Sequence, residues 1–311
     1  MMPLRIVFMG TAELACASLR ALLASPDFTV AAVVTQPDRP KGRDLKPQPS
    51  GVKKIAVEAG LPVLQPEKAR DAGFVTNLAE LAADLIVVAA YGQILPQSIL
   101  DLPRFGCVNV HASLLPKYRG AAPIQWAILN NDAETGVTIM KMSAGLDTGD
   151  ILTQKATPIG PEETTAELHD RLALLGAELL ISTLPEYAAG AIVPKPQDNA
   201  AATHARKISK EDGRIDWTMP ASALRNRIRA FTPWPGAYAH LTIRGQPRLV
   251  KFWRASVEAL HGQPGQVLRT DRDGIVIICG TDALRIEQLQ LEGGRKMTSA
   301  EFLAGHPISC S

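Results

Sequence analysis

The sequence predicts a doubly wound α/β domain with a mostly parallel, Rossmann-like sheet, followed by a small C-terminal β-barrel. Short apolar runs alternate with helical stretches over the first two-thirds of the 311 residues, and short strands separated by Gly and Asp follow. Strand and helix alternating at this spacing are typical of crossover units in a sheet covered on both faces. The chain also exceeds the usual size of a single hydrophobic core. We therefore expect two domains, 1–189 and 210–311, joined by a linker at 190–209.

The N-terminal part contains the elements of this sheet in order. The expected strands are 5–9, 29–35, 85–90, 106–110 and 136–142, and the expected short helices are 13–24, 52–59 and 97–100. The stretch 158–190 predicts a long amphipathic helix, because leucines recur in it at three- and four-residue spacing. The polar loop 35–47 contains four basic residues and three prolines, so we expect little regular structure there.

The C-terminal third predicts strands at 249–253, 265–268, 274–279 and 283–290. A small barrel fits this pattern, and the five-stranded OB-like barrel that binds nucleic acids is one candidate. Residues 204–311 contain 16 Lys and Arg against 10 Asp and Glu, whereas the preceding residues contain 17 against 21. This asymmetry indicates an anionic partner for the C-terminal domain, or an accidental surface bias.

Several classes of protein are disfavoured. No apolar run is long enough to cross a bilayer and the first residues do not resemble a signal peptide, so we expect a cytoplasmic protein. The four cysteines, Cys16, Cys107, Cys279 and Cys310, show no metal-ligand spacing; we expect reduced, mostly buried thiols and no metal. The turn after the first strand lacks the glycines of a dinucleotide fingerprint, which disfavours nicotinamide and flavin cofactors.

Asn109 and His111 lie two residues apart at the end of the strand 106–110. Because side chains alternate along a strand, both point to the same side. A histidine beside a carboxamide can combine general acid/base chemistry with stabilisation of an oxyanion. The alternative is that Asn109 caps a turn and His111 is a surface residue.

Asp147 stands between Gly145 and Gly149 in the loop after the strand 136–142. A carboxylate there can orient a histidine and favour its protonated form if the two lie close in the fold. Asp-Thr-Gly also occurs in aspartic proteases, but this chain has one such triplet, in an α/β context.

These motifs together resemble the folate-dependent formyltransferase superfamily. The motif Asn109-x-His111-x-Ser-Leu-Leu-Pro is followed about 30 residues later by Gly-Leu-Asp147-Thr-Gly. Within the superfamily, residues 35–43, 119–125 and 231–236 are similar to the methionyl-tRNA formyltransferase family. One departure is Ala112, where many members carry Gly or Pro.

The resemblance implies direct transfer of a formyl group from 10-formyltetrahydrofolate to the amino group of methionine on the initiator methionyl-tRNA, for translation initiation. Asn109 and protonated His111 would donate hydrogen bonds to the formyl oxygen, and Asp147 would hold His111 charged and help to move the proton. The segments implied for folate binding contain Ser113, Leu114, Leu115, Pro116, Gln93, Ile94 and Leu95. The basic residues expected to bind the tRNA are Arg39, Lys41, Arg43, Lys46, Lys207 and Lys210.

Alternatives remain open from the sequence. The acceptor could be glycinamide ribonucleotide or an amino sugar nucleotide, and a protein of another class would be a non-catalytic RNA-binding protein. Leu114 and Leu115 could be core residues, and the loop 35–47 could be a solvated charged loop. Arg225, Arg227 and Arg229 on one short helix fit either RNA contact or a solvated face, while Trp217 and Trp234 are expected in the domain core. We expect a monomer.

Overall fold

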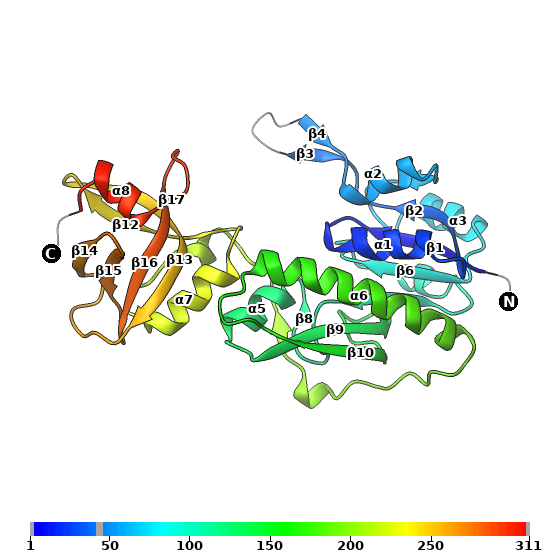
Figure 1. Cartoon of the computed structure of the whole chain (residues 1–311). Helices are drawn as coiled ribbons and strands as arrows, with labels where there is room; N and C mark the ends of the chain where they lie inside the picture. Colours follow the sequence, from blue (N-terminus) through cyan, green and yellow to red (C-terminus); the bar gives the residue numbers. More distant parts are fainter. Residues whose placement is uncertain (1–2, 42–45, 309–311) are drawn as a thin grey trace. The chain divides into compact units, whose positions relative to one another are not determined.

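The computed structural model describes residues 3–41 and 46–308 of the chain, which divide into two compact units (Figure 1). The first unit contains the described residues up to Pro123, together with Glu134–Pro158 and His169–Ala205. The second contains Ile124–Ala133, Ile159–Leu168 and the described residues from Arg206 onward. Two short segments from the N-terminal two-thirds of the sequence therefore belong to the second unit.

A seven-stranded sheet forms the centre of the first unit, in the order β10-β9-β7-β6-β1-β2-β5. Neighbours from β7 to β5 are parallel, whereas β9 runs antiparallel to β7 and to β10. The strands are β1 (Leu4–Gly10), β2 (Phe28–Val34), β5 (Val63–Leu64), β6 (Leu85–Ala89), β7 (Cys107–His111), β9 (Glu134–Lys141) and β10 (Ile151–Pro158).

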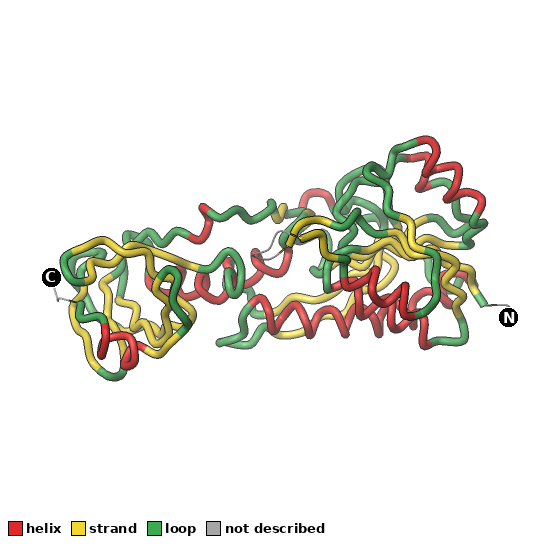
Figure 2. Tube along the Cα trace, turned by 90° about the horizontal axis from the view of Figure 1, so that it is seen from above, coloured by secondary structure: helices red, strands yellow, loops and turns green. Residues whose placement is uncertain are grey.

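Helices cover both faces of this sheet (Figure 2). Leu78 and Ile99 share one apolar cluster with Met9 and Val88 of the sheet. On the other face, Gly176 lies directly against Val110. The helices of the first unit are α1 (Leu14–Ala24), α2 (Gly51–Glu58), α3 (Ala72–Glu80), α4 (Gln97–Leu100) and most of α6 (Thr165–Ala188), whereas α5 (Pro123–Leu129) lies almost entirely in the second unit. A mostly parallel sheet between two helical layers confirms the predicted fold class.

The loop after β2 differs from the prediction. It contains two short antiparallel strands, β3 (Arg39–Lys41) and β4 (Lys46–Gln48), which pair Arg39 with Gln48. The expectation of little regular structure was wrong. Each proline removes one backbone N–H donor, but the other backbone groups of the two short strands still pair across the hairpin. Asp38 directly precedes β3, and its Oδ2 lies 2.7 Å from Nζ of Lys53, which follows β4 in the chain.

The second unit contains an antiparallel sheet in the order β12-β13-β16-β15-β14, with β17 paired to β16. Its strands are β12 (Ala237–Ile243), β13 (Gln246–Glu258), β14 (Val267–Asp271), β15 (Gly274–Ile278), β16 (Ala283–Leu291) and β17 (Met297–Thr298). Helices α7 (Ala221–Ala230) and α8 (Ser299–Gly305) contribute Leu224 and Phe302 to one apolar core with Phe252 of β13. Thr298 and Glu301 form a capping box at the start of α8.

A small parallel pairing lies beside the main sheet in the first unit. Strand β8 (Arg119–Gly120) pairs with β11 (His204–Ala205), and a short 3-10 turn, Asn199–Ala201, precedes β11. The segment 190–209, which the sequence suggests as a linker, therefore makes specific backbone contacts up to Ala205. A second 3-10 turn, Glu211–Gly213, lies in the other unit.

Among the described residues, no helix is both long and apolar enough to cross a membrane. The same part of the chain contains no group of three or more His, Cys, Asp or Glu side chains placed to hold a metal ion. Cys107 and Cys279 are buried free thiols and Cys16 is a partly buried one, which agrees with the expected thiols; Cys310 lies outside the described residues. Burial raises the pKa of Cys107 to about 12.

Candidate active site

Strand β7 places Asn109 and His111 on the same face of the main sheet. Asn109 is in register with Val88 of β6 and Met140 of β9, and His111 is in register with Thr138. Val110, between them, points to the opposite face and packs against Gly176 of α6. Both polar side chains are nearly buried, at 9% and 5% exposure.

The loop between β9 and β10 brings Asp147 to the same place. Asp147 has a φ of +52°, in the left-handed region that costs energy for residues other than glycine. Gly149 allows the loop to turn back, because a Cβ at that position would lie 1.8 Å from the carbonyl oxygen of Lys141. The loop geometry thus depends on Gly149 and presents the carboxylate of Asp147 toward β7.

The three predicted catalytic side chains converge in the structure. Asp147 Oδ1 lies 3.4 Å from Asn109 Nδ2, which donates to it, and Asp147 Oδ2 lies 3.7 Å from His111 Nδ1. The backbone N–H of Gly120 donates to Asp147 Oδ2 at 2.9 Å. The carboxylate therefore contacts the amide, faces the imidazole and is anchored by a main-chain donor, with 13% of its side chain exposed.

The second nitrogen of His111 fixes the orientation of the ring. His111 Nε2 lies 2.9 Å from the carbonyl oxygen of Tyr118. A carbonyl oxygen can only accept, so Nε2 carries the hydrogen and Nδ1 faces Asp147. Nδ1 is therefore the ring nitrogen that is directed at the carboxylate of Asp147.

A tight turn follows the histidine and contains the first predicted folate segment. Ser113 Oγ donates to the carbonyl oxygen of Lys117 at 2.6 Å, and Thr138 Oγ1 donates to the carbonyl oxygen of Ser113 at 2.7 Å. Leu115 is 3% exposed; its N–H donates to Thr138 Oγ1 and its carbonyl accepts from Gln154 Nε2. Leu114 and Pro116 are partly exposed. Ser113 and Leu115 thus have their polar groups engaged within the protein, and Leu115 occupies a core position.

The second predicted folate segment follows β6. Gln93 Oε1 accepts from Ala69 N at 2.8 Å, and Leu95 is buried in an apolar cluster. Ile94 between them is 76% exposed, which is a large value for an isoleucine. Of this segment, Ile94 alone offers its side chain fully to a ligand.

The basic residues predicted to meet tRNA are on the surface where the structure describes them. Arg39 is exposed, and its guanidinium forms an exposed ion pair with Glu67 at 2.9 Å. Lys207 and Lys210 are also exposed. Arg43 lies outside the described residues, as do the side chains of Lys41 and Lys46. The segment with Lys207 and Lys210 is anchored by Asp212, whose pKa is held well below its usual range by hydrogen bonds from Arg206.

The arginines of α7 are bound within the second unit. Arg229 is 7% exposed and donates to the carbonyl oxygens of Gly160 and Glu163, within the second unit. Arg225 pairs with Glu162, and Arg227 donates to the carbonyl oxygen of Asp212. A solvated face does not describe this row, because the guanidinium groups donate to backbone carbonyls of neighbouring segments.

The two tryptophans differ from each other. Trp217 packs against the core of the second unit and makes an edge contact with Phe252, with ring centroids 5.8 Å apart. Trp234 is 51% exposed, so its expected core position was wrong. The surrounding Pro233 and Pro235 hold the backbone of this segment in a turn, and the indole is left outside the core.

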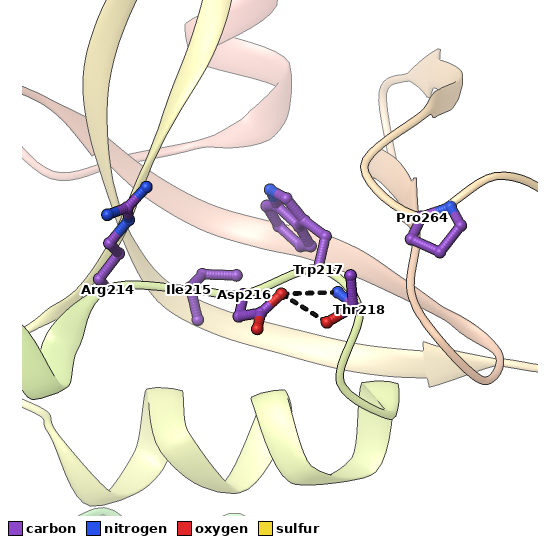
Figure 3. Close-up of a pocket in the computed structure, with 6 residues that line it drawn as sticks. All are labelled: Arg214, Ile215, Asp216, Trp217, Thr218 and Pro264. Carbon is purple, nitrogen blue, oxygen red and sulfur yellow. Dashed lines mark hydrogen bonds between the residues drawn. The ribbon is translucent and has the colours of Figure 1, made fainter.

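The second unit also contains a pocket of about 610 Å³, lined by Arg214, Ile215, Asp216, Trp217, Thr218 and Pro264 (Figure 3). Asp216 Oδ1 accepts hydrogen bonds from the backbone N–H and the hydroxyl of Thr218. The carboxylate is therefore engaged within its own turn. None of the predicted site residues lines this pocket.

Two residues beside the trio were missed from the sequence. Gln197 Nε2 donates to the carbonyl oxygens of Asp147 and Gly149, at 2.9 and 2.7 Å. Gln197 Oε1 accepts from Arg119 Nε at 3.0 Å. A single glutamine in a segment that looks like a linker has no pattern in the sequence that would indicate a role in the site. Arg119 stands out in the sequence only as the first residue of the motif 119–125.

Known protein families match most of the chain. A model of the formyl transferase family matches residues 4–184, and a model of the formyl transferase C-terminal domain matches residues 207–307. This chain belongs to the formyl transferase family. The resemblance that the sequence motifs indicate is thereby confirmed.

Relatives in the formyl transferase family match almost the whole chain. Methionyl-tRNA formyltransferase of Citrifermentans bemidjiense is 51% identical over 305 residues, covering 98% of this chain and 94% of the relative. Methionyl-tRNA formyltransferase of Aromatoleum aromaticum is 52% identical over 307 residues, covering 99% and 96%. The solved structure of HypX from Aquifex aeolicus in complex with tetrahydrofolic acid has a TM-score of 0.61 at 20% identity. That match covers 96% of this chain and 47% of HypX, and it shows the fold alone.

Proposed function

We propose that this chain transfers the formyl group of 10-formyltetrahydrofolate to the free amino group of methionine on initiator methionyl-tRNA, in preparation for translation initiation. The observation that carries the proposal is its identity of about half the residues, over nearly the full length, with relatives that are named methionyl-tRNA formyltransferase. Identity of that extent covers both units. The converging polar side chains of Asn109, His111 and Asp147 supply the chemistry that such a transfer requires.

Asn109 and His111 are proposed to stabilise negative charge on the formyl oxygen. The amide of Asn109 carries two hydrogens on Nδ2, so one can contact Asp147 while the other contacts a substrate oxygen. A fixed donor of this kind stabilises a developing oxyanion by roughly 3 to 4 kcal/mol in well-studied enzymes. The low exposure of both side chains strengthens the effect, because little water screens the charge.

Asp147 is proposed to hold the imidazolium of His111 in place and to help move the proton from the attacking nitrogen of the amine to the leaving nitrogen of the folate. Its Oδ2 faces His111 Nδ1, so a proton on that nitrogen has a carboxylate partner. The folate donor supplies the activated formyl group, and these side chains neither bond covalently to it nor require a metal in this scheme.

Folate binding is proposed for the segments Ser113–Pro116 and Gln93–Leu95. Two observations fit a flat pterin and its linker: the exposed apolar side chain of Ile94, and the partly exposed Leu114 and Pro116 beside the trio. Leu115, Ser113 and Leu95 are buried, so we assign them to shaping the segments.

Contact with tRNA is proposed for the hairpin after β2 and for the start of the second unit. Arg39, Lys41, Arg43 and Lys46 would meet the acceptor stem, and Lys207 and Lys210 would contact phosphates elsewhere. Catalysis is proposed for residues 1–189, a connecting role for 190–209, and tRNA binding for 210–311. We also propose a monomer that acts in the cytoplasm.

The decisive experiment compares acceptors. Purified protein is incubated with 10-formyltetrahydrofolate and charged initiator methionyl-tRNA, and in parallel with glycinamide ribonucleotide or an amino sugar nucleotide. We expect N-formylmethionine from the tRNA and no product from the small amines. Formylation of a small amine with none on the tRNA would overturn the proposal, and binding of tRNA without turnover would favour a non-catalytic RNA-binding protein.

A further inference from the structure

Gln197 uses both ends of its side-chain amide inside the first unit. Its Nε2 bridges the carbonyl oxygens of Asp147 and Gly149, and its Oε1 accepts from the guanidinium of Arg119. Only 9% of the residue is exposed. Because Arg119 can only donate, Oε1 must face it, and the two N–H groups must face the loop. The orientation of the amide is therefore dictated by its partners.

The clamped loop needs such support. Asp147 adopts a left-handed φ, and its neighbours Leu146 and Thr148 are exposed. A left-handed conformation persists at a non-glycine residue only when the surroundings hold it there. Gln197 holds the carbonyl groups of Asp147 and Gly149, so it restrains the peptide planes Asp147–Thr148 and Gly149–Asp150 and limits the positions open to the carboxylate.

Arg119 links this clamp to the other anchor of the carboxylate. Arg119 is 5% exposed, and its Nη2 donates to Asn199 Oδ1 at 2.9 Å. The next residue, Gly120, donates its backbone N–H to Asp147 Oδ2. A Cβ at Gly120 would lie 2.6 Å from the carbonyl oxygen of Ala205, so the strand pair β8 and β11 is close there. Gln197 and Gly120 thus hold the backbone and the carboxylate of Asp147 from one connected support.

The same segment also reaches the histidine. Thr203 Oγ1 accepts from the backbone N–H of Tyr118 at 2.8 Å, and the carbonyl oxygen of Tyr118 orients the ring of His111. Residues 197–205 therefore support both partners of the Asp147 and His111 pair. Small displacements of such groups have large effects, because transfer depends on the alignment of donors with the reacting atoms.

We propose that Gln197, oriented by Arg119, is a positioning residue for formyl transfer, setting the carboxylate of Asp147 against Asn109 and His111. The inference rests on the proposed function, in which Asp147 takes part in the reaction. It adds a residue that contacts no reacting atom and acts through the loop that it clamps.

The first test uses Gln197→Glu and Gln197→Ala, with Gln97→Ala as the matched control. Glu keeps the shape and an acceptor for Arg119, but places oxygen against two carbonyl oxygens. Gln97→Ala removes a glutamine amide hydrogen bond, to Asp101 Oδ1, in the same unit without touching the Asp147 loop or its support. We expect both Gln197 variants to lower kcat roughly tenfold to a hundredfold, with KM for folate and for tRNA within about twofold of the wild type. We expect Gln97→Ala to retain kcat within about twofold of the wild type.

The second test combines Gln197→Ala with Asp147→Asn. If Gln197 acts through Asp147, the double variant should turn over about as fast as Asp147→Asn alone in a single-turnover assay. A role in general stability predicts instead that the two losses multiply. Thermal unfolding of each variant is measured alongside. If Gln197→Ala does not fold, Gln197→Glu takes its place in the double variant.

The outcomes separate the inference from the proposed function. Absence of formylation by the wild-type chain would refute the proposed function. A wild type that formylates tRNA, together with Gln197 variants of unchanged kcat, multiplying losses in the double variant, or an equal loss in Gln97→Ala, would overturn the inference alone.

Discussion

Asp147 makes four polar contacts through its carboxylate and backbone, and its charge is the property that the proposed mechanism uses. Replacement by asparagine keeps an oxygen for the N–H of Gly120 but removes the charge that faces His111. We expect Asp147→Asn to lower kcat at least about tenfold with a modest change in KM, and His111→Ala and Asn109→Ala to do the same. Single-turnover formylation of tRNA is the measurement.

The control for this prediction is Asp150→Asn, which removes a carboxylate from the same loop and leaves the trio intact. Its turnover should stay close to that of the wild type. Wild-type turnover in all three trio variants would contradict the assigned roles, and an equal loss in Asp150→Asn would point to the net charge of the loop as the cause.

Cys107 gives a prediction about stability and pH. Burial raises its pKa from 9.0 to about 12, whereas in the unfolded chain the thiol ionises near its ordinary value. The folded state therefore holds a proton that the unfolded state loses, so this contribution is complete below about pH 8.5 and is lost as pH rises toward 12. The free energy of unfolding of the wild type should fall more steeply between about pH 8.5 and 11 than that of Cys107→Ala. If the free energies of unfolding of the wild type and of Cys107→Ala change in parallel with pH over this range, this prediction is wrong.

At the scale of elements, the hairpin of β3 and β4 presents Arg39 on the surface. Its ion pair with Glu67 is mostly exposed, so it contributes little to stability. Because phosphate contacts release counterions, we expect Arg39→Ala and Arg43→Ala to raise KM for tRNA several-fold, and to reduce its dependence on salt, without changing KM for folate.

Glu67→Gln is the matched control for Arg39→Ala, since it breaks the same ion pair and keeps the cation. This variant should leave KM for tRNA unchanged or lower it. If Arg39→Ala and Arg43→Ala both show the wild-type KM at low and at moderate salt, the hairpin is a solvated charged loop.

At the scale of the whole molecule, the second unit is built from segments far apart in the sequence. Thr165 Oγ1 donates to the carbonyl oxygen of Ala230, Arg229 donates to that of Gly160, and Trp126 Nε1 donates to that of Arg206. Each of these bonds would lose a partner in a chain cut after Ala205. We expect the fragment 1–205 to unfold at a lower temperature than the full chain and to aggregate, as seen by circular dichroism and size-exclusion chromatography.

The isolated C-terminal part, 206–311, is the complementary sample. It lacks the acceptor carbonyls for Arg229, so it should also be less stable than the full chain. Two fragments that each unfold at the temperature of the full chain would show that the shared segments contribute nothing to either part.

The sequence by itself determined the features that depend on short-range periodicity and on motif residues. The strands around Val7, Val87 and Val108 and the long helix α6 follow from apolar spacing, which reports the burial of one face. Asn109 and His111 share a face for the same reason, and the glycines around Asp147 indicate its turn. These features need no knowledge of distant partners.

Only the tertiary structure decided which distant groups meet. The clamp of Gln197 on Asp147 joins residues 50 positions apart, and the carbonyl acceptors of Arg229 lie more than 60 positions away. The pairing of β3 with β4 and the exposed position of Trp234 likewise depend on the path of the chain. A hydrogen bond of this kind adds about 1 kcal/mol and leaves no periodic pattern, because it depends on the meeting of two single groups that the whole fold brings together.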